Sequence, residues 1–412
     1  MKRGQAGHIR PSRRASGLLS GAWVTASRFG RYRRLMDVSI VVPTFNESEN
    51  VRELTRRIDA SMAGAGYSYE IWFIDDSTDS TPEVLWELSE VHPEVRYIHR
   101  TTNKGLGTAV VEGFQRAQGQ YLVVMDADLQ HPPELIPTII DRLHDGIDVV
   151  IPSRFIEGGS DGGLNLFRKF VSWTARTIAR VSIHKLRNIS DCTGGFFGVR
   201  RGVVEGVDLD PIGWKILIEV LVKGKYSRVH EIPYGFESRT AGESKMSLRE
   251  QWNFLRHIVK LVRNNPEDRR FYLFCFVGAL GVVVNLLVMT LCVRVFHLHP
   301  VGSSVVASLI AMAHNFLWND RVTWRGTDSV VAWRRVLRFP VFVAISAIGI
   351  LVTAASVELF LWLRWSELMG QLWGIVCSTI WNFLANNRWT WREISAKSSR
   401  RVIVTRERTN LL

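Results

Sequence analysis

The amino-acid sequence predicts an α/β domain with a mostly parallel sheet, followed by amphipathic helices and a four-helix membrane domain. Three observations lead to this prediction. Apolar runs of strand length alternate with segments of helical periodicity between residues 37 and 234. Several of those runs end in a cluster of polar residues. Long stretches with almost no charged residue occur after residue 270, in the last third of the chain.

The α/β region can be followed from its first apolar run. Strands are expected at 38–43, 70–74, 95–99, 121–125 and 149–154. Helices are expected at about 51–58, at 82–91 and from 103–107 onward. In a parallel sheet the carboxyl ends of neighbouring strands meet at one edge, where such folds bind ligands. The polar clusters at 43–47, 75–79 and 126–130 all fall at those ends.

The cluster at 126–130 has the composition of a metal site. Asp126, Asp128 and Gln130 follow an apolar strand, and alternate residues of an extended chain project to the same side. Two carboxylates and an amide oxygen suit Mg²⁺ or Mn²⁺, with substrate phosphates and water completing the coordination. The alternative for an isolated Asp-x-Asp is a polar turn that closes a strand. The two other clusters at the same edge favour the metal site.

Basic residues are concentrated in an N-terminal arm. The net charge is +13, and residues 1–36 supply nine positive charges and no acidic residue. We expect residues 1–36 to be disordered and to contact anionic lipid rather than nucleic acid, because no nucleic-acid recognition module accompanies them. The four cysteines show neither pairing nor metal spacing and are interpreted as small hydrophobic residues.

Two helices carry an apolar stripe beside a basic one, at about 165–182 and 247–263. In the first, Phe167, Phe170 and Val171 belong to the apolar face, which we expect to pack in the core. In the second, Trp252 and Val259 lie on the apolar stripe. Because this helix has a basic flank and comes just before a membrane segment, we expect it to lie in the membrane interface.

Four apolar segments are long enough to be membrane helices. They are expected at about 271–293, 301–319, 339–363 and 368–387. The loops on one side are heavily basic, whereas those on the other hold only Arg294 and Arg364 as basic residues. By the positive-inside rule, the protein is multi-pass, with the α/β domain and both termini in the cytoplasm. An oligomer could form through this membrane domain.

The apolar part also contains an internal repeat. Asn-Phe-Leu-Trp-Asn-Asp-Arg-Val-Thr-Trp-Arg at 315–325 recurs as Asn-Phe-Leu-Ala-Asn-Asn-Arg-Trp-Thr-Trp-Arg at 382–392. The repeat relates the first two helices to the last two, in the same orientation, and suggests a two-fold axis along the membrane normal. Such residues can be simple interface anchors. The specific repeat favours instead a helix-pair contact or a lipid-headgroup site.

With these motifs in hand, residues 37–245 resemble the nucleotide-sugar-dependent, inverting glycosyltransferases of the polyprenyl-phosphate (dolichyl-phosphate) mannose synthase group. The matching motifs are Val-Pro-Thr-Phe-Asn-Glu at 42–47, Asp-Asp-Ser-Thr-Asp at 75–79, Asn-Lys-Gly-Leu-Gly at 103–107 and Asp-Ala-Asp-Leu-Gln-His-Pro-Pro-Glu at 126–134. Residues 271–392 are similar to the GtrA-type membrane domain. The resemblance implies a Rossmann-like GT-A domain at 37–245, an amphipathic interface helix and linker at 246–270, and a basic tail at 393–412.

The resemblance also implies roles for individual residues. The nucleotide sugar would be bound by Pro43, Phe45, Glu47, Asp75, Asp76, Lys104, Asp126, Arg239 and Lys245. Mg²⁺ or Mn²⁺ would be held by Asp126, Asp128 and Gln130, and the acceptor phosphate by Arg154, Arg168 and Ser172. Among these, Asp128, Arg154 and Arg168 would be catalytic. The stretch 191–197, Asp-Cys-Thr-Gly-Gly-Phe-Phe, lacks the arginine of the family pattern Asp-x-Thr-Ser-Gly-Phe-Arg, which leaves the sugar and acceptor preference open.

The implied reaction transfers mannose from GDP-mannose to polyprenyl phosphate with inversion at the anomeric carbon, on the cytoplasmic membrane face. A phosphate monoester is already anionic near neutral pH, so the reaction requires no strong general base, and His131 is expected to be structural. One alternative is a glucosyltransferase that uses UDP-glucose and the same kind of acceptor. Two others are a translocator of lipid-linked sugar with an accessory transferase domain and a membrane-anchored binding module.

Overall fold

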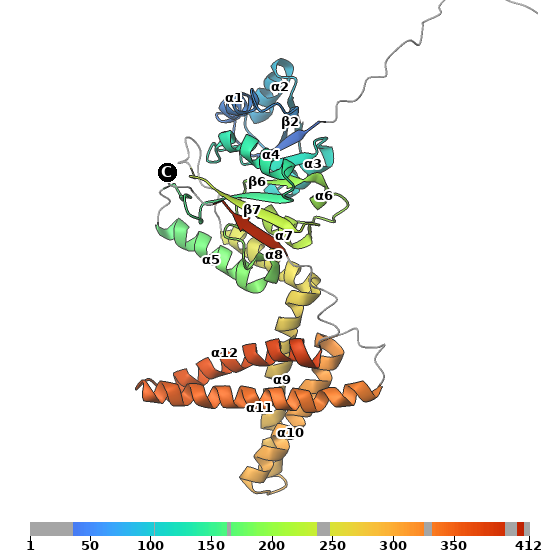
Figure 1. The fold of residues 1–412 in the computed structure, drawn as a ribbon, viewed down its shortest axis with the longest axis vertical. Helices are drawn as coiled ribbons and strands as arrows, with labels where there is room; N and C mark the ends of the chain where they lie inside the picture. The colour runs from blue at the N-terminus through green and yellow to red at the C-terminus, as the bar shows by residue number, and fades with distance from the viewer. Residues whose placement is uncertain are drawn as a thin grey trace, which may run out of the picture. The chain divides into compact units, whose positions relative to one another are not determined.

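A computed structural model describes residues 36–102, 104–162, 166–236, 248–324, 332–391 and 402–407 (Figure 1). Its strands are β1 (Val38–Thr44), β2 (Tyr69–Asp75), β3 (Val95–His99), β4 (Tyr121–Val124), β5 (Val149–Ser153), β6 (Phe197–Arg200), β7 (Arg228–Pro233) and β8 (Ile403–Arg406). The helices of the α/β region are α1 (Val51–Met62), α2 (Thr81–Val91), α3 (Leu106–Arg116), α4 (Ile136–His144), α5 (Leu166–Ser182), α6 (Arg201–Val204), α7 (Ile216–Lys223) and α8 (Leu248–Asn264).

The strands form one mostly parallel sheet in the order β3-β2-β1-β4-β6-β5-β7-β8. Only β6, among the described strands, runs antiparallel to its neighbours β4 and β5. Apolar side chains on one face of the sheet pack against α3, α7 and α8, and those on the other face pack against α1 and α4. The central strands β1, β4 and β5 are buried along their whole length because helices cover both faces. The predicted α/β class and mostly parallel sheet are confirmed.

β8 is a strand in the segment that the sequence suggested was only a basic tail. It pairs in parallel with β7, with Arg228 opposite Ile403 and Glu231 opposite Arg406 (Figure 1). The sheet is therefore completed by residues that follow the whole membrane domain in the chain. Residues 402–404 are apolar, but a run of this length is too short to predict a strand from the sequence.

The first amphipathic helix, α5, buries only part of the stripe that we expected in the core: Ile178 packs against the core, whereas the members Phe170 and Val181 do not. Phe170 is 62% exposed and Val181 is 68% exposed. The buried residues of this helix, among those described, are Ala175 and Ala179, and α5 contacts α8. In α8 the predicted stripe is largely exposed at Trp252 and Val259, and a different side of the helix, formed by Phe254, Ile258 and Leu261, is buried. Both helices thus present large apolar side chains outward.

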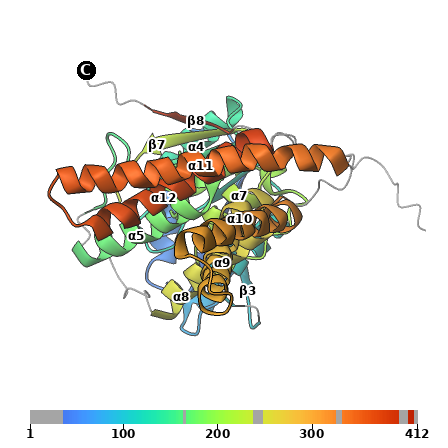
Figure 2. The ribbon, with the colours of Figure 1, turned by 90° about the horizontal axis from the view of Figure 1, so that it is seen from below.

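Four helices occupy the predicted membrane segments: α9 (Pro266–Arg294), α10 (Pro300–Trp318), α11 (Ala332–Trp362) and α12 (Glu367–Ala385). They form two pairs, α9 with α10 and α11 with α12, and the members of the second pair run side by side in both views (Figures 1 and 2). Within the described residues, Pro266–Arg294 and Arg338–Trp362 are long and apolar enough to cross a membrane. The number of crossings and their orientation stay predictions.

The repeated segments meet at the ends of α10 and α12. Each continues as a turn of π-helix, η3 (Asn319–Thr323) and η4 (Asn386–Thr390). The Trp324 and Trp391 rings that follow are buried and stack with centroids 4.0 Å apart. Trp324 Nε1 donates to Asn387 Oδ1 (3.3 Å), and Trp391 Nε1 donates to Asp320 Oδ1 (3.1 Å). This reciprocal exchange confirms that the repeat makes a helix-pair contact.

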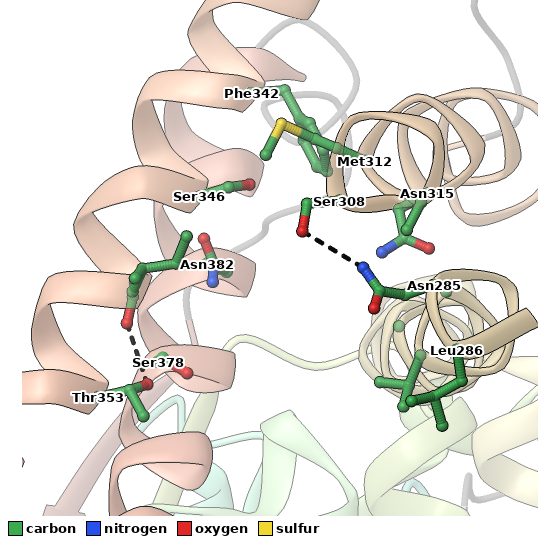
Figure 3. Close-up of a pocket in the computed structure, with 16 residues that line it drawn as sticks. Asn285, Leu286, Ser308, Met312, Asn315, Phe342, Ser346, Thr353, Ser378 and Asn382 are labelled. Carbon is green, nitrogen blue, oxygen red and sulfur yellow. Dashed lines mark hydrogen bonds between the residues drawn. The ribbon is translucent and has the colours of Figure 1, made fainter. Parts of the chain in front are cut away.

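A cavity of about 380 Å³ lies among the membrane helices (Figure 3). Its wall includes Asn285 and the two repeat-related residues Asn315 and Asn382. The side-chain Nδ2 of Asn285 donates to Ser308 Oγ (3.3 Å). A Cβ built on Gly281 would fall 2.2 Å from Asn315 Oδ1, so the absence of a side chain there lets the asparagine approach. All of its lining residues come from α9 to α12.

Candidate active site

The polar clusters after β1 and β2 lie together, as the parallel sheet predicts. Thr44 Oγ1 donates to Asp75 Oδ1 (2.9 Å), and the Asn46 amide donates to Ser77 Oγ (2.7 Å). Asn46 adopts a left-handed backbone (φ 55°), which turns the chain away from β1. The two loops are therefore bound to each other at the carboxyl edge of the sheet.

The predicted nucleotide-binding carboxylates are buried and already have partners. Asp75 also accepts from Ser77 Oγ (2.5 Å) and lies 2.7 Å from His99 Nδ1. Asp76 accepts from Arg100 Nε (2.8 Å) and Nη2 (2.6 Å) and from the Gly105 amide (2.7 Å). These carboxylates order the ends of β2 and β3 rather than standing open at the surface.

The other predicted nucleotide-binding residues surround these carboxylates. Lys104 is exposed, and its Nζ donates to the Asp76 carbonyl (3.0 Å). Pro43 is buried within β1, whereas the Phe45 ring is 43% exposed at the rim. Glu47 is partly buried, accepts from Asn50 Nδ2 (2.7 Å) and begins the approach to α1. The structure thus leaves Phe45 and Lys104 as the most accessible side chains of this group.

The Asp126–Gln130 motif forms a turn rather than the extended chain that we expected. β4 ends at Val124, and Leu129 has a left-handed backbone (φ 59°). Within the turn, the Gln130 amide donates to Asp128 Oδ1 (3.2 Å). The prediction that Asp126, Asp128 and Gln130 project to one side because they alternate along a strand is therefore wrong. The turn after β4 sets their positions instead.

His131 is structural, as predicted. Its ring is 3% exposed and stacks on Phe196 with centroids 5.3 Å apart. Its Nδ1 accepts from the Asp126 amide (3.1 Å), and an imidazole nitrogen that accepts in this way carries no proton. The histidine therefore fixes the beginning of the Asp126–Gln130 turn.

The donor set of the turn fits a hard divalent cation. Asp126 keeps about a third of its side chain exposed and Asp128 is mostly buried. Among the described residues there is no group of three or more His, Cys, Asp or Glu side chains that could hold a metal alone. Two carboxylates and the Gln130 amide oxygen would thus share a cation with ligands from the substrate, which is the usual pattern for Mg²⁺ at phosphates.

The loop at 191–195 packs directly on this turn. A Cβ built on Gly195 would fall 2.6 Å from Asp126 Oδ2, so a residue with a side chain would displace that carboxylate. After the loop, Phe197 enters β6 and is fully buried in the core. The position where the family pattern has an arginine is therefore a core position in this chain and supplies no cation to the site.

Arg154, at the end of β5, faces the same loop. Its Nε donates to Asp191 Oδ2 (2.9 Å) and its Nη2 to Asp191 Oδ1 (3.3 Å). The guanidinium carbon also lies 5.1 Å from the centroids of Phe155 and Phe236. Two hydrogen bonds and two aromatic contacts fix the plane of the guanidinium, and Asp191 occupies the edge formed by Nε and Nη2.

Two further cations belong to this region and were missed from the sequence. Lys215, just before α7, donates to the Thr193 carbonyl (2.9 Å) and lies over the Trp214 ring. Burial, and then the nearby positive charge of Arg154, lower the pKa of Lys215 to about 8. Arg176 on α5 lies 3.6 Å from the Phe155 centroid, and burial lowers its pKa. Lys215 and Arg176 are isolated basic residues that belong to no recognisable motif. The sequence therefore gave no reason to select them over other lysines and arginines.

The remaining predicted site residues are described only in part. Ser172 lies on α5 and is partly buried. Arg168 belongs to the same helix, and its side chain is outside the described residues. Arg239 and Lys245 also lie outside the described residues.

Comparisons with known proteins agree with this arrangement. Residues 39–207 match the family model of glycosyl transferase family 2, and residues 273–391 match that of the GtrA/DPMS transmembrane domain. The dolichol-phosphate mannosyltransferase of Pyrococcus furiosus is 40% identical over 86% of this chain and 99% of its own length. That of Saccharomyces cerevisiae is 35% identical over 64% of this chain and 98% of its own length.

Solved structures give a more distant match. A glucosyl-3-phosphoglycerate synthase from Mycobacterium tuberculosis, in complex with Mn²⁺, UDP-glucose and phosphoglyceric acid, is 16% identical to this chain. The alignment covers 55% of this chain and 78% of the synthase, with a TM-score of 0.40. The family is therefore indicated by the sequence relatives.

Proposed function

Since this chain belongs to the dolichol-phosphate mannosyltransferase family and is a glycosyltransferase, we propose that it transfers mannose from GDP-mannose to a polyprenyl (dolichyl) phosphate. The products would be polyprenyl-phosphate mannose and GDP. The observation that carries this proposal is the juxtaposition of opposite charges across the 191–195 loop. Asp126 lies against Gly195 at one end of the loop, Arg154 binds Asp191 at the other end, and Lys215 binds the Thr193 carbonyl between them.

The carboxylate side of the loop is proposed to receive the sugar-nucleotide diphosphate. Asp126, Asp128 and Gln130 would hold Mg²⁺ or Mn²⁺, which would neutralise charge on the departing diphosphate. Phe45 offers an exposed ring for the base, and Glu47 lies beside it in the chain for the ribose. Asp75 and Asp76 support this part of the site through their hydrogen bonds to Thr44 and Arg100. We propose that Arg239 and Lys245 contact the donor phosphates.

The cationic side is proposed to receive the acceptor phosphate. Arg154 is held in one plane and can present the other guanidinium edge to phosphate oxygens, with Arg168 and Ser172 as further contacts. An acceptor oxygen would attack the anomeric carbon as the bond from that carbon to the diphosphate breaks. Attack from the side opposite the leaving group inverts the configuration. No residue has to remove a proton from the ionised phosphate, which agrees with the structural role of His131.

The lipid acceptor requires the active site to lie at a membrane surface. Trp173 on α5 and Trp252 on α8 are 53% and 63% exposed, as are other large apolar side chains of the two helices. We propose that these side chains enter the headgroup region, with the catalytic domain on the cytoplasmic face. This orientation follows the basic loops of the membrane domain.

The proposal can be tested with the full-length chain in lipid vesicles containing polyprenyl phosphate. Radiolabelled GDP-mannose and UDP-glucose are supplied separately, with Mg²⁺ or with a chelator. We expect Mg²⁺-dependent label in lipid from GDP-mannose, abolished by Asp128→Asn. Asp145→Asn, in the turn after α4, is the matched control and should transfer as the wild type does. Label from UDP-glucose alone would refute the mannosyl assignment, and no label from either donor would refute transfer.

A further inference from the structure

The C-terminal strand β8 reaches the buried network behind the acceptor side of the site. Arg406 donates from Nε to Glu231 Oε2 (3.0 Å) and from Nη2 to the Asn188 carbonyl (2.9 Å). Glu231, on β7, has no exposed surface. Among the residues that the structure describes, Arg406 is the cation that pairs with this carboxylate. In the sequence, the whole membrane domain separates Glu231 from Arg406, although the two residues form one ion pair.

Glu231 in turn holds the loop that orients Arg154. Its Oε1 accepts from Ser190 Oγ (2.6 Å), from the Ser190 amide (2.7 Å) and from the Asp191 amide (3.3 Å). Because the Ser190 hydroxyl donates to the carboxylate, it accepts from Ser153 Oγ, 2.5 Å away. Ser153 immediately precedes Arg154, and Asp191 binds its guanidinium. Glu231 therefore fixes both residues that set the position of Arg154.

A carboxylate without solvent contact is costly unless its charge is compensated. The hydroxyl and amide donors of Ser190 and Asp191 compensate one oxygen of Glu231, and Arg406 compensates the other. Removal of Arg406 would leave a buried charge with no cationic partner. Glu231 would then turn toward water, which weakens its hold on the Ser190–Asp191 backbone.

We propose that Arg406 is a positioning residue for the acceptor phosphate, acting through Glu231 and the Ser190–Asp191 segment on Arg154. The proposal rests on the proposed function, because it takes Arg154 to be the acceptor-phosphate ligand. The donor side should be affected less, since Asp191 binds Arg154 directly, whereas the Asp126–Gln130 turn meets the same loop at its far end, at Gly195. Arg406 should consequently affect acceptor use far more than donor use.

The same strand provides a control. Glu407, next to Arg406, pairs with Arg142 Nη2 on α4 (2.6 Å) and does not touch Glu231 through its side chain. Glu407→Gln therefore weakens the attachment of β8 to the domain without removing the partner of Glu231. A purely structural role of β8 would make the two variants similar.

The experiment measures steady-state transfer by the full-length chain in vesicles, with the acceptor and the donor varied separately. Arg406→Gln should raise the KM for polyprenyl phosphate about 10-fold and change the donor KM less than about 2-fold. Arg406→Lys keeps a charge that can reach the carboxylate and should recover part of the loss. Glu407→Gln should resemble the wild type in both KM values.

A double-variant comparison tests whether Arg406 acts through Glu231. Glu231→Gln removes the buried charge, so adding Arg406→Gln to it should change the acceptor KM less than about 2-fold. This comparison also stands if Arg406→Gln alone does not fold. Equal increases in both KM values, equal effects of Glu407→Gln and Arg406→Gln, or a full additive effect in the double variant would overturn the proposal. Transfer failing in the wild type itself would overturn the proposed function instead.

Discussion

Transfer should decline as the pH rises through about 8, because Lys215 then loses its proton. Burial is the largest cause of the lowered pKa of this lysine, followed by the charge of Arg154. Below that pH the ammonium adds a positive charge beside Thr193, between the proposed donor and acceptor phosphates. Above it, the site keeps Arg154 but loses this second cation. Bound phosphates favour the charged lysine, so the decline in kcat should occur at higher pH than that in kcat/KM.

The same lysine should reduce the stability of the protein. Its pKa is about 8 in the folded chain instead of 10.5. At about 1.4 kcal/mol per pKa unit, the charged form costs up to about 3 kcal/mol of folding free energy at neutral pH, less whatever solvent contact the side chain retains. The folded pKa lies below the unfolded one, so the unfolded state binds more protons between them. The free energy of unfolding should therefore rise from about pH 8 to about pH 10.5.

Two variants separate these effects. Lys215→Arg stays charged and should lose the alkaline decline in kcat/KM between pH ~7 and ~10. Lys215→Met should transfer poorly at all pH values but unfold at a higher temperature than the wild type at neutral pH. The measurements are initial rates against pH and thermal unfolding in detergent. An unchanged alkaline decline in Lys215→Arg, or a Lys215→Met variant no more stable than the wild type, would refute the reasoning.

Three further predictions concern the site, the membrane domain and the interface helices. Gly195→Ala should lower kcat/KM roughly 100-fold without unfolding the domain, as followed by circular dichroism, because its Cβ displaces the Asp126 carboxylate. Trp391→Ala should cost about 3–5 kcal/mol in detergent unfolding, and the exposed Trp389→Ala much less. Trp252→Glu should raise the KM roughly tenfold for acceptor in vesicles but not for a short, soluble acceptor.

The strands β1 to β5 could be predicted because most of them are short apolar runs bounded by polar turns. The expected strand 70–74 is observed as Tyr69–Asp75, and 95–99 as Val95–His99. The clusters after β1 and β2 could be placed together because parallel strands end at one edge. The membrane helices and the contact between their repeats were predictable for a similar reason, since hydrophobic length and duplication are properties of the sequence alone.

Other features depend on contacts between distant segments and had no local signal. Lys215 is a single cation whose neighbours come from the ends of β4 and β5 and from the loop before β6. The Asp126–Gln130 turn depends on the left-handed Leu129, a residue type that rarely adopts this backbone. The outward stripe of α5 has the same helical period as a buried one, so periodicity could not tell a core from a membrane surface.

The pairing of β8 with β7 has a consequence for how the protein is made. β7 ends at Pro233 and β8 begins at Ile403, so the ribosome must synthesise the intervening 169 residues, including every membrane helix, before the sheet can close. At about 5–20 residues per second, this takes on the order of ten to thirty seconds. During that interval Glu231 lacks Arg406. The nascent chain can therefore form the Glu231–Arg406 ion pair only after the four helices α9 to α12 have been synthesised.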